Sequence, residues 1–314
     1  MRSPVCECLP PHTPQHARSA CGFCHGSRTR PLPRHRLHLQ PRASTAPCVF
    51  RLCTSPCGAP PRLPVGGTGH TGSDPSVFVQ RSENRVRAAL ISDLHLEGGP
   101  NDPVQQAFVD WLDALDVDAL YLLGDLFHGW WGYRDVVPAR LVATCAALER
   151  ARQRGLAIHV VPGNHDFALG PFFTETLGAT IHPPGPHQFD GRTFFLAHGD
   201  EADDSLGYRV TRRVLRGPAF ASLMRLLGPS LGWRLLHQMA GTSRATPSDP
   251  DRLRAQQQAW SQPHLAAGAD YVVLGHIHAP GRSADGRVIH LGGWEDDRTW
   301  CLVDQGEPRL IRPS

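Results

Sequence analysis

The sequence of 314 residues contains no lysine, so arginine supplies every permanently cationic side chain, which we interpret as a coding bias. It also contains no run of about eighteen apolar residues, the minimum for a membrane-spanning helix. The N-terminus lacks the apolar stretch that forms the centre of a secretory signal peptide. These absences argue against an integral membrane protein and against a cleaved secretory leader.

Cysteine is scarce outside the N-terminal segment. Seven of the nine cysteines lie in the first 57 residues, and only Cys145 and Cys301 lie further along the chain. Two cysteines cannot form a disulfide framework, so residues 86–314 are expected to be a reduced, intracellular domain in the cytoplasm.

Residues 1–85 are rich in proline, arginine and cysteine and have almost no apolar periodicity. Such a composition predicts a disordered extension, or a segment upstream of the true start codon. A zinc module built on Cys6, Cys8, Cys21 and Cys24 and an arginine-rich transit peptide are the alternatives. Residues 1–86 hold eleven arginines against three acidic residues, and the remainder holds 21 against 26. The basic balance therefore belongs to the extension and gives no reason to expect nucleic-acid binding by the domain, although binding through the basic extension stays open.

The pattern changes near Val86, where short apolar runs begin to alternate with helical periodicity. Helices are expected from Pro103 to Leu115, after the start signal Asn101-Asp102-Pro103, and over Ala139–Arg154. Alternating strands and helices favour a layered α/β domain. The expected strands are Val86–Ile91, Ala119–Leu123, Ala157–Val161, Thr193–Ala197 and Tyr271–Leu274.

Each of these strands ends at a cluster of residues that can bind metal. In α/β sheets, ligands bind at the carboxyl ends of strands, so five such clusters in order are hard to explain as turn residues. The clusters are Asp93-Leu94-His95, Gly124-Asp125, Gly163-Asn164-His165-Asp166, His198-Gly199-Asp200 and Gly275-His276-Ile277-His278.

This ordered set resembles the signature of the calcineurin-like metallophosphoesterases. The resemblance implies a four-layer α/β/β/α sandwich with two divalent metal ions. It assigns Asp93, His95, Asp125 and His278 to one ion, and Asp125, Asn164, His198 and His276 to the other. Carboxylates and imidazoles without thiolates suit manganese, with iron, zinc or magnesium as alternatives. A pair of such ions activates a bridging water for in-line attack on phosphorus.

Three nearby polar residues fall outside the ligand set. The resemblance suggests that His165 protonates the leaving group or stabilises charge. Asp166 is expected to contact a metal-binding histidine and orient its ring. Asp200 either has the same role or is an ordinary turn residue.

Residues 206–265, between the last two motifs, are expected to form a helical insertion. Arg209, Arg212, Arg213 and Arg216 have the spacing of one helix face, and no acidic residue occurs from Arg209 to Arg244. A strongly apolar helical stretch follows Gly217-Pro218. A helix with an apolar face usually packs that face on the rest of its domain. The excess of arginine favours instead a lid that holds phosphate and acyl chains and that contacts an anionic membrane.

The insertion and the motifs together resemble the UDP-2,3-diacylglucosamine diphosphatase family of the lipid A pathway. The matching stretches are Ile91–Leu96, Tyr121–Phe127 followed by Trp130, Gly163–Phe167, and His198–Asp200 followed by Asp203, Asp204 and Gly207-Tyr208. The resemblance covers residues 86–312. It implies hydrolysis of UDP-2,3-diacylglucosamine to UMP and 2,3-diacylglucosamine 1-phosphate, and peripheral association with the inner membrane. It also implies substrate contacts by Tyr208, Arg209 and Arg216.

Two departures from that family leave other substrates open. His165 stands where the family often has arginine, and Ala279 where it has a basic residue. The alternatives are a paralogous enzyme that acts on another phosphodiester or nucleotide, a broad phosphoesterase, and a metal-binding scaffold without catalysis. The sequence does not indicate an oligomeric state.

Overall fold

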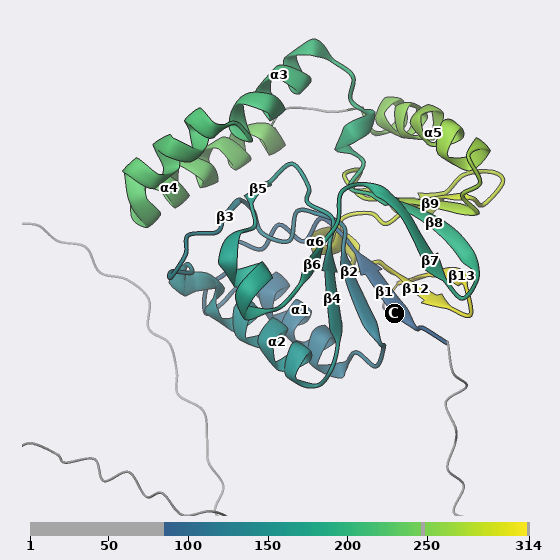
Figure 1. The fold of residues 1–314 in the computed structure, drawn as a ribbon, viewed down its shortest axis with the longest axis horizontal. Coiled ribbons are helices and arrows are strands. Elements are labelled where there is room, and N and C mark those ends of the chain that lie inside the picture. The colour runs from purple at the N-terminus through teal and green to yellow at the C-terminus, as the bar shows by residue number, and fades with distance from the viewer. Residues whose placement is uncertain (1–84, 246–248, 313–314) are drawn as a thin grey trace, which may run out of the picture. The chain divides into compact units, whose positions relative to one another are not determined.

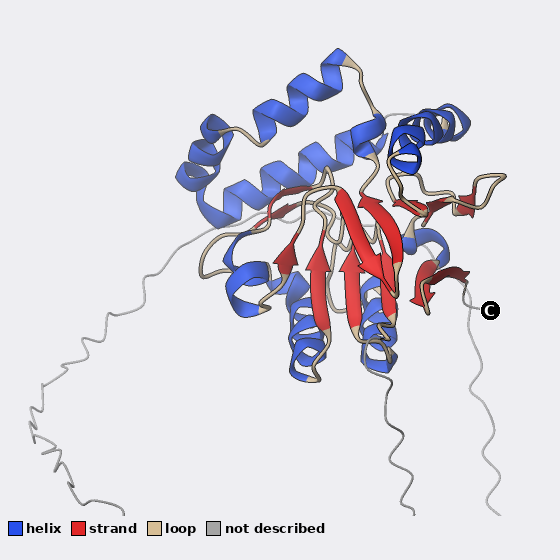
Figure 2. Ribbon diagram, turned by 45° about the vertical axis from the view of Figure 1, so that its right-hand side comes forward, coloured by secondary structure: helices blue, strands red, loops and turns tan. Residues whose placement is uncertain are grey.

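The computed structural model describes residues 85–245 and 249–312, and the N-terminal extension expected over residues 1–85 lies almost wholly outside them. All described residues belong to the compact unit Asp74–Ser314. Two sheets face each other at its centre, as Figures 1 and 2 show.

The first sheet has six strands and contains three of the expected ones. Neighbours are parallel from β1 to β6, whereas β12 and β13 are antiparallel additions at the β1 edge. The strands in spatial order are β13 (Glu307–Ile311), β12 (Trp300–Asp304), β1 (Ala88–Ile91), β2 (Ala119–Leu122), β4 (Ala157–Val160) and β6 (Thr180–Ile181).

The second sheet has five strands and contains the other two expected ones. β8 pairs in parallel with β9, and β9 with β11, so the motifs that follow β8 and β9 emerge at one edge. The strands in spatial order are β10 (Gly281–Arg282), β11 (Val288–His290), β9 (Tyr271–Leu274), β8 (Arg192–Ala197) and β7 (Gly185–Phe189).

Three apolar layers confirm the expected α/β/β/α sandwich. Alternate residues of β1 point to opposite sides: Ile91 packs under α1 (Pro103–Ala114) and α2 (Val142–Gln153), and Leu90 packs between the sheets. The outer face of the second sheet packs on α5 (Pro250–Ala266) through residues such as Leu265. Strands that are buried on both faces read as continuous apolar runs, which is why the sequence pattern revealed them.

Two further helices lie between β8 and β9 in the chain. They are α3 (Leu206–Leu215) and α4 (Pro218–Ala245), and Figure 1 shows them together on the side where the strands end. Gly228, with φ 67° and followed by Pro229, breaks α4 into two segments. Phe220, Met224 and Leu236 of α4 pack against Trp131.

The remaining elements are short and surround the site. Trp131 belongs to β3 (Trp130–Trp131), which pairs with β5 (Asp166–Ala168). One-turn helices occupy Ala139–Leu141, Phe172–Thr176, Asp200–Ala202 and α6 (Trp294–Asp297). No described helix is both long enough and apolar enough to cross a membrane.

A cluster of three histidines joins the first sheet to the edge of the second. His159 Nδ1 lies 3.0 Å from His182 Nε2, and the ring centres of His182 and His187 lie 4.6 Å apart. Burial and the neighbouring histidines lower the pKa of His187 to about 4, and burial lowers those of His159 and His182. The folded state therefore binds fewer protons than the unfolded chain below the ordinary histidine pKa.

We expect stability to fall as the pH falls from about 6.5 to about 4. One unit of pKa shift corresponds to about 1.4 kcal/mol, and solvent around these half-buried rings reduces the effect. The free energy of unfolding should drop by about 1–2 kcal/mol more in the wild type than in His187→Gln over this range. Urea denaturation at several pH values measures the free energy of unfolding of both proteins. Parallel pH curves for the two proteins would refute the expectation.

Candidate active site

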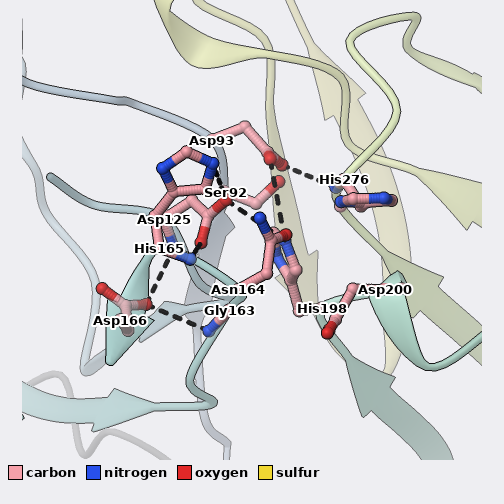
Figure 3. A network of polar contacts seen from close by, with 12 residues as sticks. Ser92, Asp93, Asp125, Gly163, Asn164, His165, Asp166, His198, Asp200 and His276 are labelled. Carbon is pink, nitrogen blue, oxygen red and sulfur yellow. Dashed lines mark hydrogen bonds and ion pairs between the residues drawn. The ribbon is translucent and has the colours of Figure 1, made fainter. Parts of the chain in front are cut away.

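The residues of all five motifs lie at the carboxyl ends of β1, β2, β4, β8 and β9, as Figure 3 shows for most of them. Parallel pairing of β1, β2 and β4 brings the first three motifs side by side, and pairing of β8 with β9 does the same for the last two. The facing of the two sheets then joins both halves around the buried carboxylates of Asp93 and Asp125.

One group of ligand atoms contains three of the four residues expected around the first ion. Asp93 Oδ1 lies 3.8 Å from His95 Nε2 and 3.8 Å from His278 Nε2. The fourth residue, Asp125, places Oδ2 at 3.9 Å from His95 Nε2. His278 is in turn oriented through Nδ1, which lies 2.9 Å from Asp296 Oδ2.

The second group centres on His198, which is fully buried. Its Nε2 lies 3.4 Å from Asp125 Oδ2 and 3.1 Å from Asn164 Oδ1, and its Nδ1 lies 2.8 Å from the carbonyl oxygen of Leu123. His276 is placed differently: its backbone N–H donates to Asp93 Oδ2 at 2.8 Å. Figure 3 shows its ring to one side of the carboxylates, with its centre 5.3 Å from that of His198.

These distances fit divalent metal ions. The separations of 3.4–4.0 Å between carboxylate oxygen and imidazole nitrogen are too long for hydrogen bonds. Two ligands that are each about 2.0–2.2 Å from one ion lie roughly 3–4 Å apart. The spacing and the oxygen and nitrogen donors therefore suit a pair of borderline-hard cations.

The backbone at several of the metal-capable residues is held in an uncommon conformation. Asp93, His95, Asp125 and His276 all have φ between 45° and 68°, in the left-handed region that non-glycine residues rarely occupy. Each such residue costs about 1–3 kcal/mol. Four such residues at one site indicate that the fold is less stable than it could be, and that the strained backbone directs these side chains into the site.

Two glycines permit the close approach of the strand ends. A Cβ at Gly163 would lie 2.2 Å from Asp125 Oδ1, and one at Gly275 would lie 2.5 Å from Asp93 Oδ2. Any side chain at these positions would displace a carboxylate, which explains the glycine that precedes Asn164 and His276.

The electrostatics of the site favour cations between the carboxylates. Burial raises the pKa of Asp125, but His198, His165 and His95 outweigh it and hold that pKa well below its ordinary value. Burial lowers the pKa of His198, but Asp125 and Asp93 raise it well above the ordinary value. The buried carboxylates thus retain protons on His198, and a bound metal ion would take the place of that positive charge.

His165 is buried beside this cluster. Its backbone N–H donates to Asp125 Oδ1 at 2.8 Å, and its Nδ1 lies 2.7 Å from the carbonyl oxygen of His128. The carbonyl requires a proton on Nδ1, so Nε2 is directed toward Asp125 Oδ2, 4.0 Å away. His165 also forms a close group with His95 and Asp125.

Asp166 contacts main-chain groups, not a histidine ring. Its Oδ2 accepts hydrogen bonds from the N–H groups of Asp125 and Gly163, at 2.9 and 3.0 Å. Burial and the charge of Asp125 raise its pKa to about 6. It therefore clamps two motif loops together.

Asp200 is buried behind His198 and is bound by α3. Tyr208 donates its hydroxyl proton to Asp200 Oδ2 at 2.5 Å, and Arg212 Nε lies 3.1 Å from the same oxygen. Arg212 also pairs with Glu201 at 3.1 Å, and Arg216 donates to the carbonyl oxygen of Gly163 at 2.7 Å. Two side chains of α3 and the arginine that caps its end thus fasten the helix to the loops that carry the metal-capable residues.

A cavity of about 580 Å³ lies between α3, α4 and the metal-capable residues. Of the expected substrate contacts, Tyr208 and Arg216 line it, whereas Arg209 lies on an exposed surface of α3. Arg212, which sequence reasoning did not select, lines it instead, although its place in the arginine series was visible. The cavity also includes Asn164, His165, Phe167, Leu215 and Met239.

Gln257 of α5 is a second residue that sequence reasoning missed. Its side-chain N–H groups donate to the carbonyl oxygens of Gly199 and Gly275, at 3.3 and 3.1 Å, next to His198 and His276. His290 Nδ1 lies 2.8 Å from its Oε1. A glutamine within a helix gives no sequence signal for this role.

Comparison with known proteins agrees with the fold and the motifs. Residues 86–280 match the calcineurin-like phosphoesterase family. UDP-2,3-diacylglucosamine hydrolase of Pseudomonas putida KT2440 is 34% identical over 239 residues, covering 69% of this chain and 94% of that protein. The enzyme of the same name from Pseudomonas fluorescens SBW25 is 34% identical over 234 residues, covering 69% and 91%.

Among solved structures, an archaeal phosphodiesterase aligns at a TM-score of 0.39 and 14% identity, covering 72% of this chain and 99% of that one. Family assignment rests on the sequence matches and on the motifs at the strand ends. The chain belongs to the calcineurin-like phosphoesterase family, and its curated relatives in that family include UDP-2,3-diacylglucosamine hydrolases.

Proposed function

We propose that the protein is a hydrolase that cleaves the pyrophosphate bond of UDP-2,3-diacylglucosamine, giving UMP and 2,3-diacylglucosamine 1-phosphate. The observation that carries this proposal is the 34% identity over nearly the whole length of hydrolases named for that substrate. The cavity supports it, because it joins the metal-capable residues to arginine and to apolar side chains. A lipid-linked nucleotide sugar needs both kinds of contact.

We assign each residue of the site a separate role in this reaction. Asp93, His95, Asp125 and His278 would hold one divalent ion, and Asp125, Asn164, His198 and His276 the other, with manganese the favoured metal. The ions would supply an activated water and would stabilise charge on the phosphoryl oxygens. His165 lines the cavity, and its doubly protonated ring, which keeps Nδ1–H on the carbonyl oxygen of His128, would donate the Nε2 proton to the departing oxygen. Arg212 and Arg216 give positive charge beside the phosphates.

The full chain supplied with Mn²⁺ should release UMP from UDP-2,3-diacylglucosamine, as measured by chromatography of the nucleotide. A sample treated with chelator should be inactive and should recover with added metal. Turnover of an aryl phosphodiester without UMP release would support the paralogous alternative, which His165 in place of the family's arginine favours.

We further propose that α3 and α4 form a lid that docks on the cytoplasmic face of the inner membrane. Leu206, Val210 and Val214 lie at intervals of four on α3 and are exposed, and Leu226 of α4 is 85% exposed. Exposed apolar residues beside arginine are typical of a surface that inserts among anionic lipid headgroups.

The double substitution Val210→Glu and Leu226→Glu should weaken binding to anionic vesicles by at least about tenfold, because it removes apolar area and adds negative charge. Sedimentation with phosphatidylglycerol vesicles measures this. Val142→Glu, at a similarly exposed position on α2, is the control. Equal binding by all three proteins would exclude this docking surface.

A further inference from the structure

A second cluster of metal-capable side chains adjoins the candidate active site and has no role in the proposed reaction. It consists of Glu97, two residues beyond His95, of His128, three residues beyond Asp125, and of His237 in the second segment of α4. One ligand atom of each lies within 4.8 Å of the others. Three separate segments therefore converge on one point.

The first two members are held in register by the backbone. Leu96 and Phe127 form a parallel bridge, and the N–H of His128 donates to the carbonyl oxygen of Leu96 at 3.1 Å. Glu97 and His128 thus follow paired positions, and Glu97 Oε1 lies 3.7 Å from His128 Nδ1. That separation exceeds a hydrogen bond and fits two ligands of one ion.

The third member is brought in by α4. The ring centres of His128 and His237 lie 4.6 Å apart. Two contacts anchor the second segment of α4. Trp233 Nε1, four residues before His237, donates to the carbonyl oxygen of Trp131 at 3.2 Å, and at the start of the segment the Tyr133 hydroxyl donates to the carbonyl oxygen of Gly228 at 2.9 Å.

His237 Nδ1 is buried and has no hydrogen-bond partner among the described residues. An unsatisfied buried ring nitrogen costs about 1–3 kcal/mol, so a ligand at this atom would offset a real penalty.

We propose that Glu97, His128 and His237 bind one further divalent transition-metal ion. Two imidazoles and one carboxylate form a ligand set that zinc occupies in proteins, with a coordination position left for water. The ion would join the loops after β1 and β2 to α4, and would thereby fix the helix that covers the cavity. This proposal goes beyond the hydrolytic function and does not depend on the identity of the substrate.

The test counts metal ions in the full chain. Wild type, Glu97→Gln and His237→Gln are loaded with Zn²⁺, passed through a desalting column and measured by inductively coupled plasma mass spectrometry. Each variant should hold one equivalent of zinc fewer than the wild type. Glu175→Gln, which alters another exposed carboxylate, should hold the wild-type number. Because the Glu97 side chain is exposed, we expect its substitution to leave the fold intact. Equal zinc content in the wild type and in Glu97→Gln would therefore overturn the proposal.

Thermal unfolding gives an independent readout. Zn²⁺ added beyond the equivalents that Glu97→Gln retains should raise the Tm of the wild type by about 5 °C and leave that of the variant unchanged. An equal rise in both would place the additional ion elsewhere. Neither measurement involves hydrolysis, so a negative UMP assay would count against the proposed function and leave this result intact.

Discussion

Asp125→Asn should reduce UMP release by at least about a thousandfold, because it removes the charge at the centre of the site. Asp125 Oδ2 faces the Nε2 atoms of three histidines: His95 at 3.9 Å, His198 at 3.4 Å and His165 at 4.0 Å. Its other oxygen accepts the backbone N–H of His165, a bond that the asparagine carbonyl can keep. The substitution therefore removes charge while it preserves shape, and both metal ions should bind more weakly.

Metal content and kcat/KM, measured on the same preparation, check this prediction. Asp110→Asn, which alters an exposed carboxylate on α1, should keep both at wild-type levels. Circular dichroism should show an intact fold in both variants. An Asp125→Asn protein with full metal content and normal turnover would mean that the reaction uses another centre.

His165→Ala should lower kcat by about 10²- to 10⁴-fold with little change in metal content, because the ring is expected to protonate the leaving group. The hydrogen bond from Nδ1 to the carbonyl oxygen of His128 fixes the ring so that, in its doubly protonated form, Nε2–H points to the site. A nitrophenolate leaving group needs no proton, so turnover of a nitrophenyl phosphodiester should suffer much less than turnover of the nucleotide sugar.

The comparison of the two substrates separates catalysis from structure. His187→Gln, in the other histidine cluster, should affect neither substrate. Loss of a metal ion from His165→Ala would make His165 a ligand, in keeping with its closeness to His95 and Asp125, and would end its assignment as the proton donor.

Five strands could be predicted from the sequence because their buried residues form continuous apolar runs. The five expected strands all occur, and the strand over Tyr271–Leu274 has the expected bounds. Eight further strands were not expected: β3, β6 and β10 have two residues each, too few to show periodicity, and the others are β5, β7, β11, β12 and β13. The expected helix over Ala139–Arg154 opens with a one-turn segment before α2 begins at Val142.

The roles of charged side chains near the site were harder to predict. Asp166 was expected behind a histidine and holds two backbone N–H groups instead. Arg209 in α3 and Arg216 at its C-terminal cap have the spacing of one helix face, yet only Arg216 lines the cavity. Spacing places residues on one face of a helix, but the rotation of the helix against its neighbours decides which of them meet the site.

The sequence by itself determined the strand ends and the metal-capable residues that follow them, because parallel pairing within each sheet brings those ends to one edge of that sheet. Only the tertiary structure decided how α3 and α4 sit against that edge. Their contacts join residues distant in the chain, such as Tyr133 with Gly228 and His128 with His237. Such contacts depend on side-chain packing and produce no periodic pattern in the sequence. The cavity and the second metal-capable cluster could therefore be recognised only in the structure.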